Sequence, residues 1–140
     1  MHVSAFKSLQ GYLYLGSPYS KYPLGAETAY RHICKISGDL VKLGVPIFSP
    51  IAHSHSIAVE SGIDIYSHAI WMPVDQPFMD AALGMIIAPM EGWRESYGVK
   101  LEIEEFERGF KPIFTMDLTF ELSALNSTAR KIIETFQEAA

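Results

Sequence analysis

The chain has 140 residues, which is enough for one domain with a hydrophobic core and too few for two ordinary domains. Hydrophobic residues make up 49% of the chain and charged residues 19%, a globular composition that excludes extended disorder and coiled coils. The net charge is −5, and no segment concentrates Lys and Arg. A partner as anionic as duplex nucleic acid is therefore not expected.

Cys34 is the single cysteine, so an internal disulfide and a Cys-based zinc cluster are excluded and a reducing compartment is expected. The N-terminal residues contain no apolar stretch long enough for a signal peptide. No other segment approaches the roughly 20 apolar residues of a membrane span. We therefore expect a cytoplasmic protein without a membrane partner.

The chain alternates between apolar runs bounded by glycine or proline and segments of helical periodicity. From Leu24 onward, apolar residues recur on one helical stripe, and Gly44 ends it. Gly62, Pro73 and Pro77 interrupt the middle of the chain, where we expect short helices and loops. The predicted strands are residues 11–16, 45–50, 84–89 and 111–116, and a last helix is predicted from about residue 120 to 136.

This alternation predicts an α/β fold. We expect a single domain over residues 1–140 with a Rossmann-like or flavodoxin-like parallel sheet of four to five strands and helices on both faces. In such sheets, ligands bind beyond the carboxyl ends of the strands. The candidate positions are residues 16–20, 49–55, 89–98 and those after residue 116.

The segment "GWRESYGVKLEIEEFERGF" predicts an amphipathic helix with four glutamates. At about 100° per residue, a core face of Val99, Ile103, Phe106 and Phe110 leaves Glu104 and Glu105 about 130° away, in solvent. Glu102 and Glu107 lie about 70° from that face.

Glu102 is the glutamate of interest, because it is expected in the first turn of this helix, near the ligand-binding edge of the sheet. It either stabilises the helix N-terminus or takes part in chemistry.

The loop "GSPYS" after the first strand can turn backbone N–H groups and hydroxyls towards an anion, or it is a tight turn fixed by Pro18. It matches neither a P-loop nor a dinucleotide fingerprint. Within the strand before it, Tyr14 is expected to be buried, so its hydroxyl needs a partner such as a carboxylate.

His53 and His55 lie two apart, so in an extended segment both rings would point the same way. Without a third ligand they do not predict a metal site, and a sugar or phosphate contact or a plain loop position is the alternative. Trp71 and Asp75 form an i, i+4 pair that either orients a nucleobase or a sugar hydroxyl, or is structural. His68 falls in a helical stretch, where a structural role is expected.

With "YLGSPYS", "FSPIAHSHSIA" and "APMEGWRESYGVKLEIE" in this order, the chain resembles the nucleoside 2-deoxyribosyltransferase superfamily, in particular an uncharacterised bacterial branch. The resemblance covers residues 12–114. It implies an enzyme acting on the N-glycosidic bond of a 2′-deoxynucleoside or deoxynucleoside 5′-monophosphate, as a transferase or as an N-glycosidase in nucleotide metabolism. It also implies a homo-oligomer. Leu101 lies almost opposite the predicted core face of its helix, so it either packs under a neighbouring loop or, as we expect, forms a subunit contact.

The resemblance assigns roles to individual residues. Glu102 resembles the nucleophile that attacks the anomeric carbon, Tyr14 the tyrosine that orients it, and Asp75 the aspartate that contacts the base and donates a proton to it. Ser96 with Ser17 indicates a phosphorylated substrate. The further substrate-binding candidates are Gly16, Gly98, His53 and Trp71.

This scheme requires no metal and no organic cofactor, and its small-molecule partner is a nucleoside or nucleotide. Two alternatives stay open. One is a non-catalytic nucleotide-binding or regulatory module on the same fold, and the other is a purely structural oligomeric domain.

Overall fold

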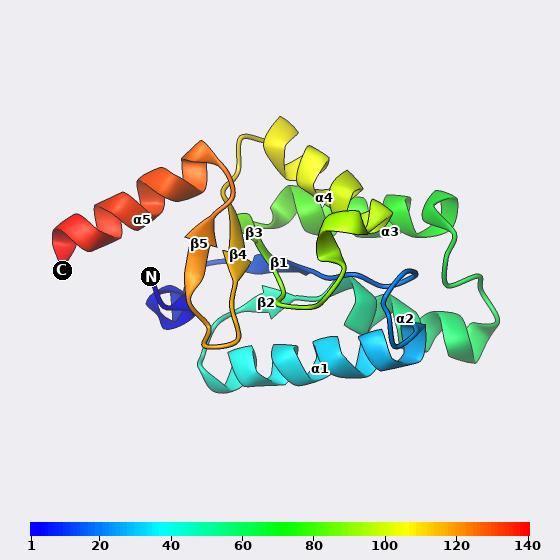
Figure 1. Cartoon of the computed structure of the whole chain (residues 1–140). Helices are drawn as coiled ribbons and strands as arrows, with labels where there is room; N and C mark the ends of the chain where they lie inside the picture. The colour runs from blue at the N-terminus through cyan, green and yellow to red at the C-terminus, as the bar shows by residue number, and fades with distance from the viewer.

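A computed structural model describes residues 1–140 and has a five-stranded sheet in the order β2-β1-β3-β4-β5 (Figure 1). The pairs β1–β2, β1–β3 and β3–β4 are parallel, and β5 is antiparallel to β4. The predicted α/β class is therefore confirmed. The strands are β1 Leu13–Gly16, β2 Ile47–Phe48, β3 Gly84–Ile87, β4 Ile113–Met116 and β5 Leu122–Ala124.

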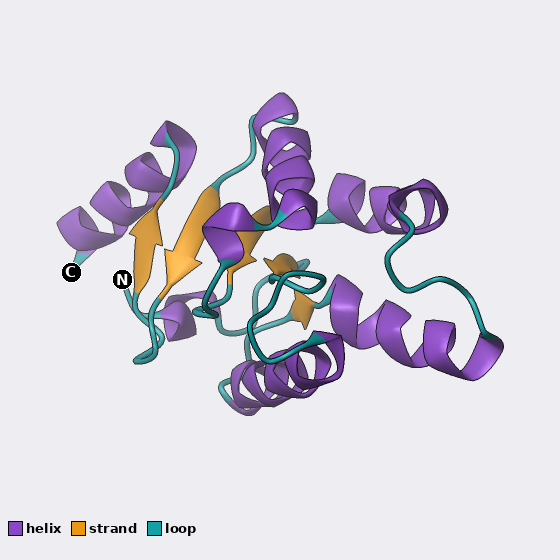
Figure 2. Ribbon diagram, turned by 45° about the vertical axis from the view of Figure 1, so that its right-hand side comes forward, coloured by secondary structure: helices purple, strands orange, loops and turns teal.

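Helices cover both faces of the sheet, as Figure 2 shows. Alternation along β1 places Leu13 and Leu15 in one core cluster, with side chains of α1 and α5, and Tyr14 in the other, with side chains of α3 and α4. Helix α2 packs beside α1. The helices are α1 Ala26–Lys42, α2 Pro50–Ser61, α3 His68–Ala81, α4 Tyr97–Arg108 and α5 Ser127–Ala139, with short 3-10 turns η1 Val3–Phe6 and η2 Trp93–Glu95. No helix is long and apolar enough to cross a membrane.

Side-chain caps fix where the helices next to the strand ends begin. Ser49, Ser67 and Ser96 accept hydrogen bonds from the backbone N–H groups of Ala52, Ile70 and Val99, at the starts of α2, α3 and α4. Helix α1 ends before Gly44, whose φ of 78° confirms the predicted helix-ending glycine.

The middle of the chain differs from the prediction of short helices and loops, because Pro73 and Pro77 lie inside one continuous helix, α3. Both prolines are exposed and one turn apart, so they lie on the solvent side of the helix. Their missing N–H groups leave the carbonyl groups of Ala69 and Pro73 facing water, which can satisfy them.

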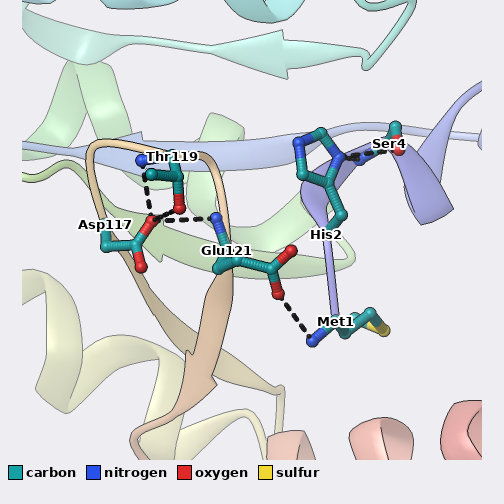
Figure 3. Close-up of polar contacts among 6 residues, drawn as sticks. All are labelled: Met1, His2, Ser4, Asp117, Thr119 and Glu121. Carbon is teal, nitrogen blue, oxygen red and sulfur yellow. Dashed lines mark hydrogen bonds and ion pairs between the residues drawn. The ribbon is translucent and has the colours of Figure 1, made fainter.

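Strand β5 is a second difference, since the sequence predicts a helix from about residue 120. The turn of residues 117–121, which begins at Asp117, brings β5 back along β4 (Figure 3). One carboxylate oxygen of Asp117 accepts hydrogen bonds from the backbone N–H and hydroxyl of Thr119 and from the backbone N–H of Glu121, at 2.8, 2.6 and 3.1 Å. The N-terminal amine of Met1 lies 3.2 Å from the Glu121 carboxylate and ties the first residue to this hairpin.

Helix α4 carries a buried face that is rotated from the predicted one. Phe110 lies beyond the helix end and is 87% exposed, so it is not a core residue. Val99, Phe106 and Glu102 are the buried residues of α4, and Ile103 is half-buried. The face therefore turns towards Glu102. Because the helix begins at Tyr97, Glu102 lies in its second turn and not in the first.

The other glutamates of α4 follow the prediction only in part. Glu104 and Glu107 are exposed, as predicted for Glu104. Glu105 is half-buried and pairs with Arg108 and the Gln76 side chain, so its prediction as a freely solvated residue is wrong. Leu101 is half-buried, not fully exposed.

Candidate active site

A cleft opens where the carboxyl ends of β1 and β2 meet the N-termini of α2, α3 and α4. The strand order places β1 between β2 and β3, so the chain leaves β1 in one direction and returns on its other side. Ligands bind open α/β sheets at this kind of switch point. In Figure 1 the loop after β1 and helices α2 and α3 lie together at the right of the sheet.

Glu102 lies in this cleft and is 8% exposed. The Tyr14 hydroxyl donates a 2.5 Å hydrogen bond to its Oε2. Burial raises the pKa of Glu102 to about 8, the hydrogen bond from Tyr14 opposes this rise, and the nearby negative charge of Asp75 adds to it. The environment therefore favours a carboxyl group that takes up a proton easily.

Tyr14 holds the Glu102 carboxylate from the interior of the protein, since it is fully buried in β1. Its ring packs against Phe106 and Phe48, with centroids 5.4 and 6.1 Å away. Burial, together with the neighbouring carboxylates, raises the pKa of Tyr14 well above its ordinary value. The phenol therefore stays protonated at neutral pH and donates its hydrogen to Glu102.

Asp75 projects from α3 into the same cleft and is 8% exposed. Its Oδ1 is buried without a hydrogen-bond partner. Burial raises its pKa to about 6. Two carboxyl groups with raised pKa values, one of them carrying an unpaired oxygen, thus share one cleft, which is the arrangement of an acid–base site.

The predicted binding residues of the β1–α1 loop and the α4 start also meet here. Ser17, Ser96 and Gly98 line the cleft, and the Ser17 hydroxyl is buried without a partner. Gly16 lies beneath it, where an added Cβ would sit 2.4 Å from the Met85 methyl group and 3.5 Å from Glu102 Oε1. Glycine at position 16 therefore leaves room for the Met85 side chain, whereas the distance to the Glu102 carboxylate is an ordinary contact.

Trp71 lines the cleft one helical turn before Asp75. Its indole N–H donates a 2.9 Å hydrogen bond to the Asp64 carbonyl, which fastens the α2–α3 connection to α3. His68, for which the sequence predicts a structural role, also lines the cleft, with its ring edge-on to Tyr97 at 5.0 Å.

His53 does not belong to the lining, contrary to its prediction as a binding residue. Both histidines of the pair lie on helix α2, where two positions correspond to about 200°, so the rings point in different directions. His53 packs against Phe48 and Phe78, at 5.5 and 5.7 Å, and its Nδ1 is buried without a partner. The extended-segment interpretation is therefore wrong.

Tyr19, Ser54 and Tyr66 line the cleft, although sequence reasoning does not assign them to it. The tyrosine and serine hydroxyls are visible in the motifs around the first loop and the His pair, but their shared location depends on the packing of α2. Nowhere in the chain do three or more His, Cys, Asp or Glu side chains lie close enough together to hold a metal ion.

The fold and this cleft define an α/β protein with a buried acidic site at the carboxyl ends of a mostly parallel sheet. The chain belongs to the family described as "Domain of unknown function (DUF1937)", whose model matches residues 11–118. That match contains β1 to β4 and every cleft residue described above. No curated protein matches the chain in a sequence comparison.

Proposed function

We propose that this protein cleaves or transfers the N-glycosidic bond of a 2′-deoxynucleoside or deoxynucleoside 5′-monophosphate, with Glu102 as the nucleophile. The observation that carries this proposal is the 2.5 Å hydrogen bond from Tyr14 to Glu102 in a buried cleft that also contains Asp75. The proposal draws in addition on the ordered motifs by which the sequence resembles nucleoside 2-deoxyribosyltransferases.

In the first step, a carboxylate oxygen of Glu102 attacks C1′ of the sugar. The C1′–N bond breaks, its electron pair stays on the base nitrogen, and a proton from Asp75 neutralises the leaving base. Covalent attack divides the displacement of a poor leaving group into two easier steps through oxocarbenium-like transition states. Tyr14 holds Glu102 in one orientation, because its ring is fixed in the core.

The proposed roles use the less populated of two protonation states, because the higher pKa of Glu102 places the shared proton mainly on Glu102 between pH 6 and pH 8. With pKa values near 6 and 8, Asp75 and Glu102 together hold one proton between these two pH values. The reaction needs one ionised carboxylate and one carboxylic acid. The reactive arrangement places the proton on Asp75, and positive charge that develops at C1′ favours the ionised form of Glu102.

In the second step, the glycosyl ester on Glu102 is attacked at C1′, and Glu102 leaves as a carboxylate. Water as the acceptor makes the enzyme a hydrolase, and a second nucleobase makes it a transferase. In either case, Asp75 has lost its proton to the first base and can accept one from the incoming nucleophile.

The rest of the cleft supplies groups suited to such a ligand. The faces of Trp71 and His68 can stack on a planar base, and the unpaired Ser17 hydroxyl can bond a sugar or phosphate oxygen. We also propose a cytoplasmic homo-oligomer with Leu101 at a subunit contact. Light scattering tests the assembly, and a monomer contradicts it.

The test of the activity is incubation of the protein with the four deoxynucleosides and their 5′-monophosphates, with chromatographic detection of free base. We expect release by the natural chain and a loss of at least about a hundredfold in Glu102→Ala, because removal of a nucleophile costs several kcal/mol of transition-state stabilisation. Unchanged release by Glu102→Ala contradicts the role of Glu102. Nucleotide binding without release identifies instead the non-catalytic module.

A further inference from the structure

A chain of hydrogen bonds runs from the cleft wall to the protein surface through three elements. The Tyr19 hydroxyl, in the β1–α1 loop, is hydrogen-bonded to Nδ1 of His55 on α2. His55 Nε2 lies 2.8 Å from a carboxylate oxygen of Glu27 on α1. Tyr19 lines the cleft, His55 is 5% exposed, and Glu27 is exposed to solvent.

Aromatic packing holds the imidazole of His55 in place. Tyr30 stacks on it with centroids 4.2 Å apart and planes inclined by 20°, and Tyr19 meets it edge-on at 5.6 Å. Tyr66 contacts the other side of Tyr19 at 5.8 Å. The position of the Tyr19 oxygen is therefore fixed before a ligand arrives.

The partners of His55 determine where its hydrogen lies. Hydrogen bonds from His55 and Arg31 lower the pKa of Glu27, so at neutral pH Glu27 is a carboxylate that can only accept. Nε2 must then carry a hydrogen and donate it to Glu27. In the neutral imidazole Nδ1 is left as an acceptor, and the Tyr19 hydroxyl donates to it.

Tyr19 has one hydroxyl hydrogen, and this hydrogen is used in the hydrogen bond to His55. Burial raises the pKa of Tyr19 to about 12, so the phenol does not ionise at neutral pH. The Tyr19 oxygen thus offers only lone pairs to the cleft and can accept a hydrogen bond but cannot donate one.

We propose that Tyr19, oriented by His55 and Glu27, is an acceptor subsite for the 5′-hydroxyl of a deoxynucleoside and selects the neutral nucleoside over the corresponding 5′-monophosphate. A phosphate oxygen has no hydrogen to give and would face the lone pairs of Tyr19. This inference rests on the proposed function for its substrate class and narrows the two substrates named there to one.

The charge of the cleft points the same way. Its lining contains Asp75 and Glu102 and no Lys or Arg, so a phosphate dianion would meet two carboxyl groups and no cationic side chain. The N-termini of α2, α3 and α4 border the cleft and attract anions. The measured preference is the balance of these terms, and substitutions of Tyr19 and Glu27 isolate the contribution of the acceptor.

Tyr19 contacts a part of the ligand away from the reacting bond. Its hydroxyl is hydrogen-bonded to His55 on α2, whereas Glu102 on α4 is hydrogen-bonded to Tyr14 on β1. The donor that Tyr19 selects is the 5′-hydroxyl of the sugar, which is the hydrogen-bond donor that a deoxynucleoside has and its 5′-monophosphate lacks. Tyr19 is a binding residue, and His55 and Glu27 are positioning residues.

Calorimetric dissociation constants for each deoxynucleoside and its own 5′-monophosphate test the proposal, repeated in a Glu102→Ala background where the ligands stay intact. The natural chain is expected to bind the nucleoside more tightly. Tyr19→Phe should weaken nucleoside binding about fivefold to tenfold, the value of one hydrogen bond, and leave monophosphate binding unchanged or tighter. Tighter binding of the monophosphate by the natural chain, or equal losses for both ligands in Tyr19→Phe, overturns the proposal.

Glu27→Lys tests the orientation, because an ammonium group can only donate to Nε2 and so favours the tautomer that frees the Tyr19 hydrogen. Nucleoside preference should fall about fivefold, and long-range ¹H–¹⁵N NMR should show His55 losing its Nε2–H form. Glu60→Lys on exposed α2 makes the same change of charge without contacting His55 and should change neither reading. An unchanged preference in Glu27→Lys, or an Nδ1–H tautomer in the natural chain, contradicts the orientation.

The dissociation constants and the NMR tautomer of His55 are measured independently of turnover. Base release with the opposite ligand preference would reject the acceptor subsite and keep the proposed function. The predicted preference without base release would keep the subsite and reject catalysis. Absence of binding by every nucleoside and nucleotide would reject both.

Discussion

The Tyr14 hydroxyl donates to Glu102 across 88 positions of sequence. The contact joins the central strand β1 to helix α4 beneath the cleft. Because the phenol is locked in the core, the hydrogen bond fixes the rotamer of the carboxylate as well as opposing the rise in the pKa of Glu102 that burial causes. In the proposed mechanism both effects favour an ionised, correctly placed nucleophile.

Tyr14→Phe should therefore lower kcat by about tenfold to a hundredfold, since it removes one hydrogen bond that positions a charged reacting group. The loss of this bond should also raise the pKa of Glu102 further, so the alkaline limb of the pH profile should move to higher pH. Steady-state kinetics across pH measure both. Tyr12→Phe is the matched control, because Tyr12 donates to the Phe78 carbonyl outside the cleft; equal effects of the two variants would assign Tyr14 a structural role only.

The pH dependence of kcat/KM should be bell-shaped with limbs near 6 and 8, the pKa values of Asp75 and Glu102 in the free protein. Below the first value both carboxyl groups are protonated and no nucleophile is present. Above the second both are ionised and no acid remains for the leaving base. A rate that keeps rising through pH 9 would show that no carboxylic acid takes part.

Glu102 should also make stability depend on pH. Its folded-state pKa of about 8 lies above the value of about 4.3 in an unfolded chain, so the folded state binds the proton more tightly. The contribution of Glu102 to the free energy of unfolding is fully present below pH 4 and is lost as pH rises through 8. Glu102→Gln cannot titrate, so its free energy of unfolding relative to the natural chain should rise between pH 4 and pH 8, on the order of 2 to 4 kcal/mol.

Denaturant titrations of both chains at several pH values measure this difference. Glu105→Gln is a suitable control, because the pKa of Glu105 is lowered by Arg108 and Gln76 and the sign of its effect is opposite. A difference between Glu102→Gln and the natural chain that stays constant with pH would mean that Glu102 ionises normally.

Gly98 offers a substitution that separates stability from binding. A Cβ at this position would lie 3.6 Å from His68 and 4.0 Å from the Ser96 hydroxyl, which is ordinary contact. Gly98→Ala should therefore stabilise the fold by about 0.5 kcal/mol, since alanine favours a helix over glycine. The methyl group enters the cleft and should weaken ligand binding several-fold. Thermal unfolding and calorimetry test the two effects, and unaltered affinity would place the ligand away from Gly98.

Local patterns predict most of the fold. The four parallel strands are apolar runs with glycine or proline next to at least one end, and the stripe on α1 follows from helical periodicity, so each is visible within a short window. Strand β5 is not visible in this way. It has three residues, and its pairing with β4 depends on the turn that the Asp117 carboxylate stabilises. Helix α3 escapes prediction because two prolines are tolerated only where their side of a helix faces solvent.

The site is predictable where helical geometry, a buried strand and the family resemblance agree on the same residues. Together they indicate Glu102, Tyr14 and Asp75, and the fold places Glu102 and Asp75 in one cleft with Tyr14 buried next to Glu102. The prediction that His53 binds the ligand is wrong, because the direction of its side chain depends on α2 being a helix. Nothing in the sequence near Glu27 indicates a link to the cleft, since its contact with His55 exists only once α1 and α2 pack together.

The most direct test of the central claim is mass spectrometry of the acid-quenched reaction with the deoxynucleoside that the protein cleaves fastest. A covalent glycosyl-enzyme must add one 2-deoxyribosyl group to the peptide that contains Glu102. We predict this adduct in the natural chain and its absence in Glu102→Gln, together with loss of base release. Base release that continues in Glu102→Gln, with the Glu102 peptide of the natural chain unmodified throughout, would contradict the account.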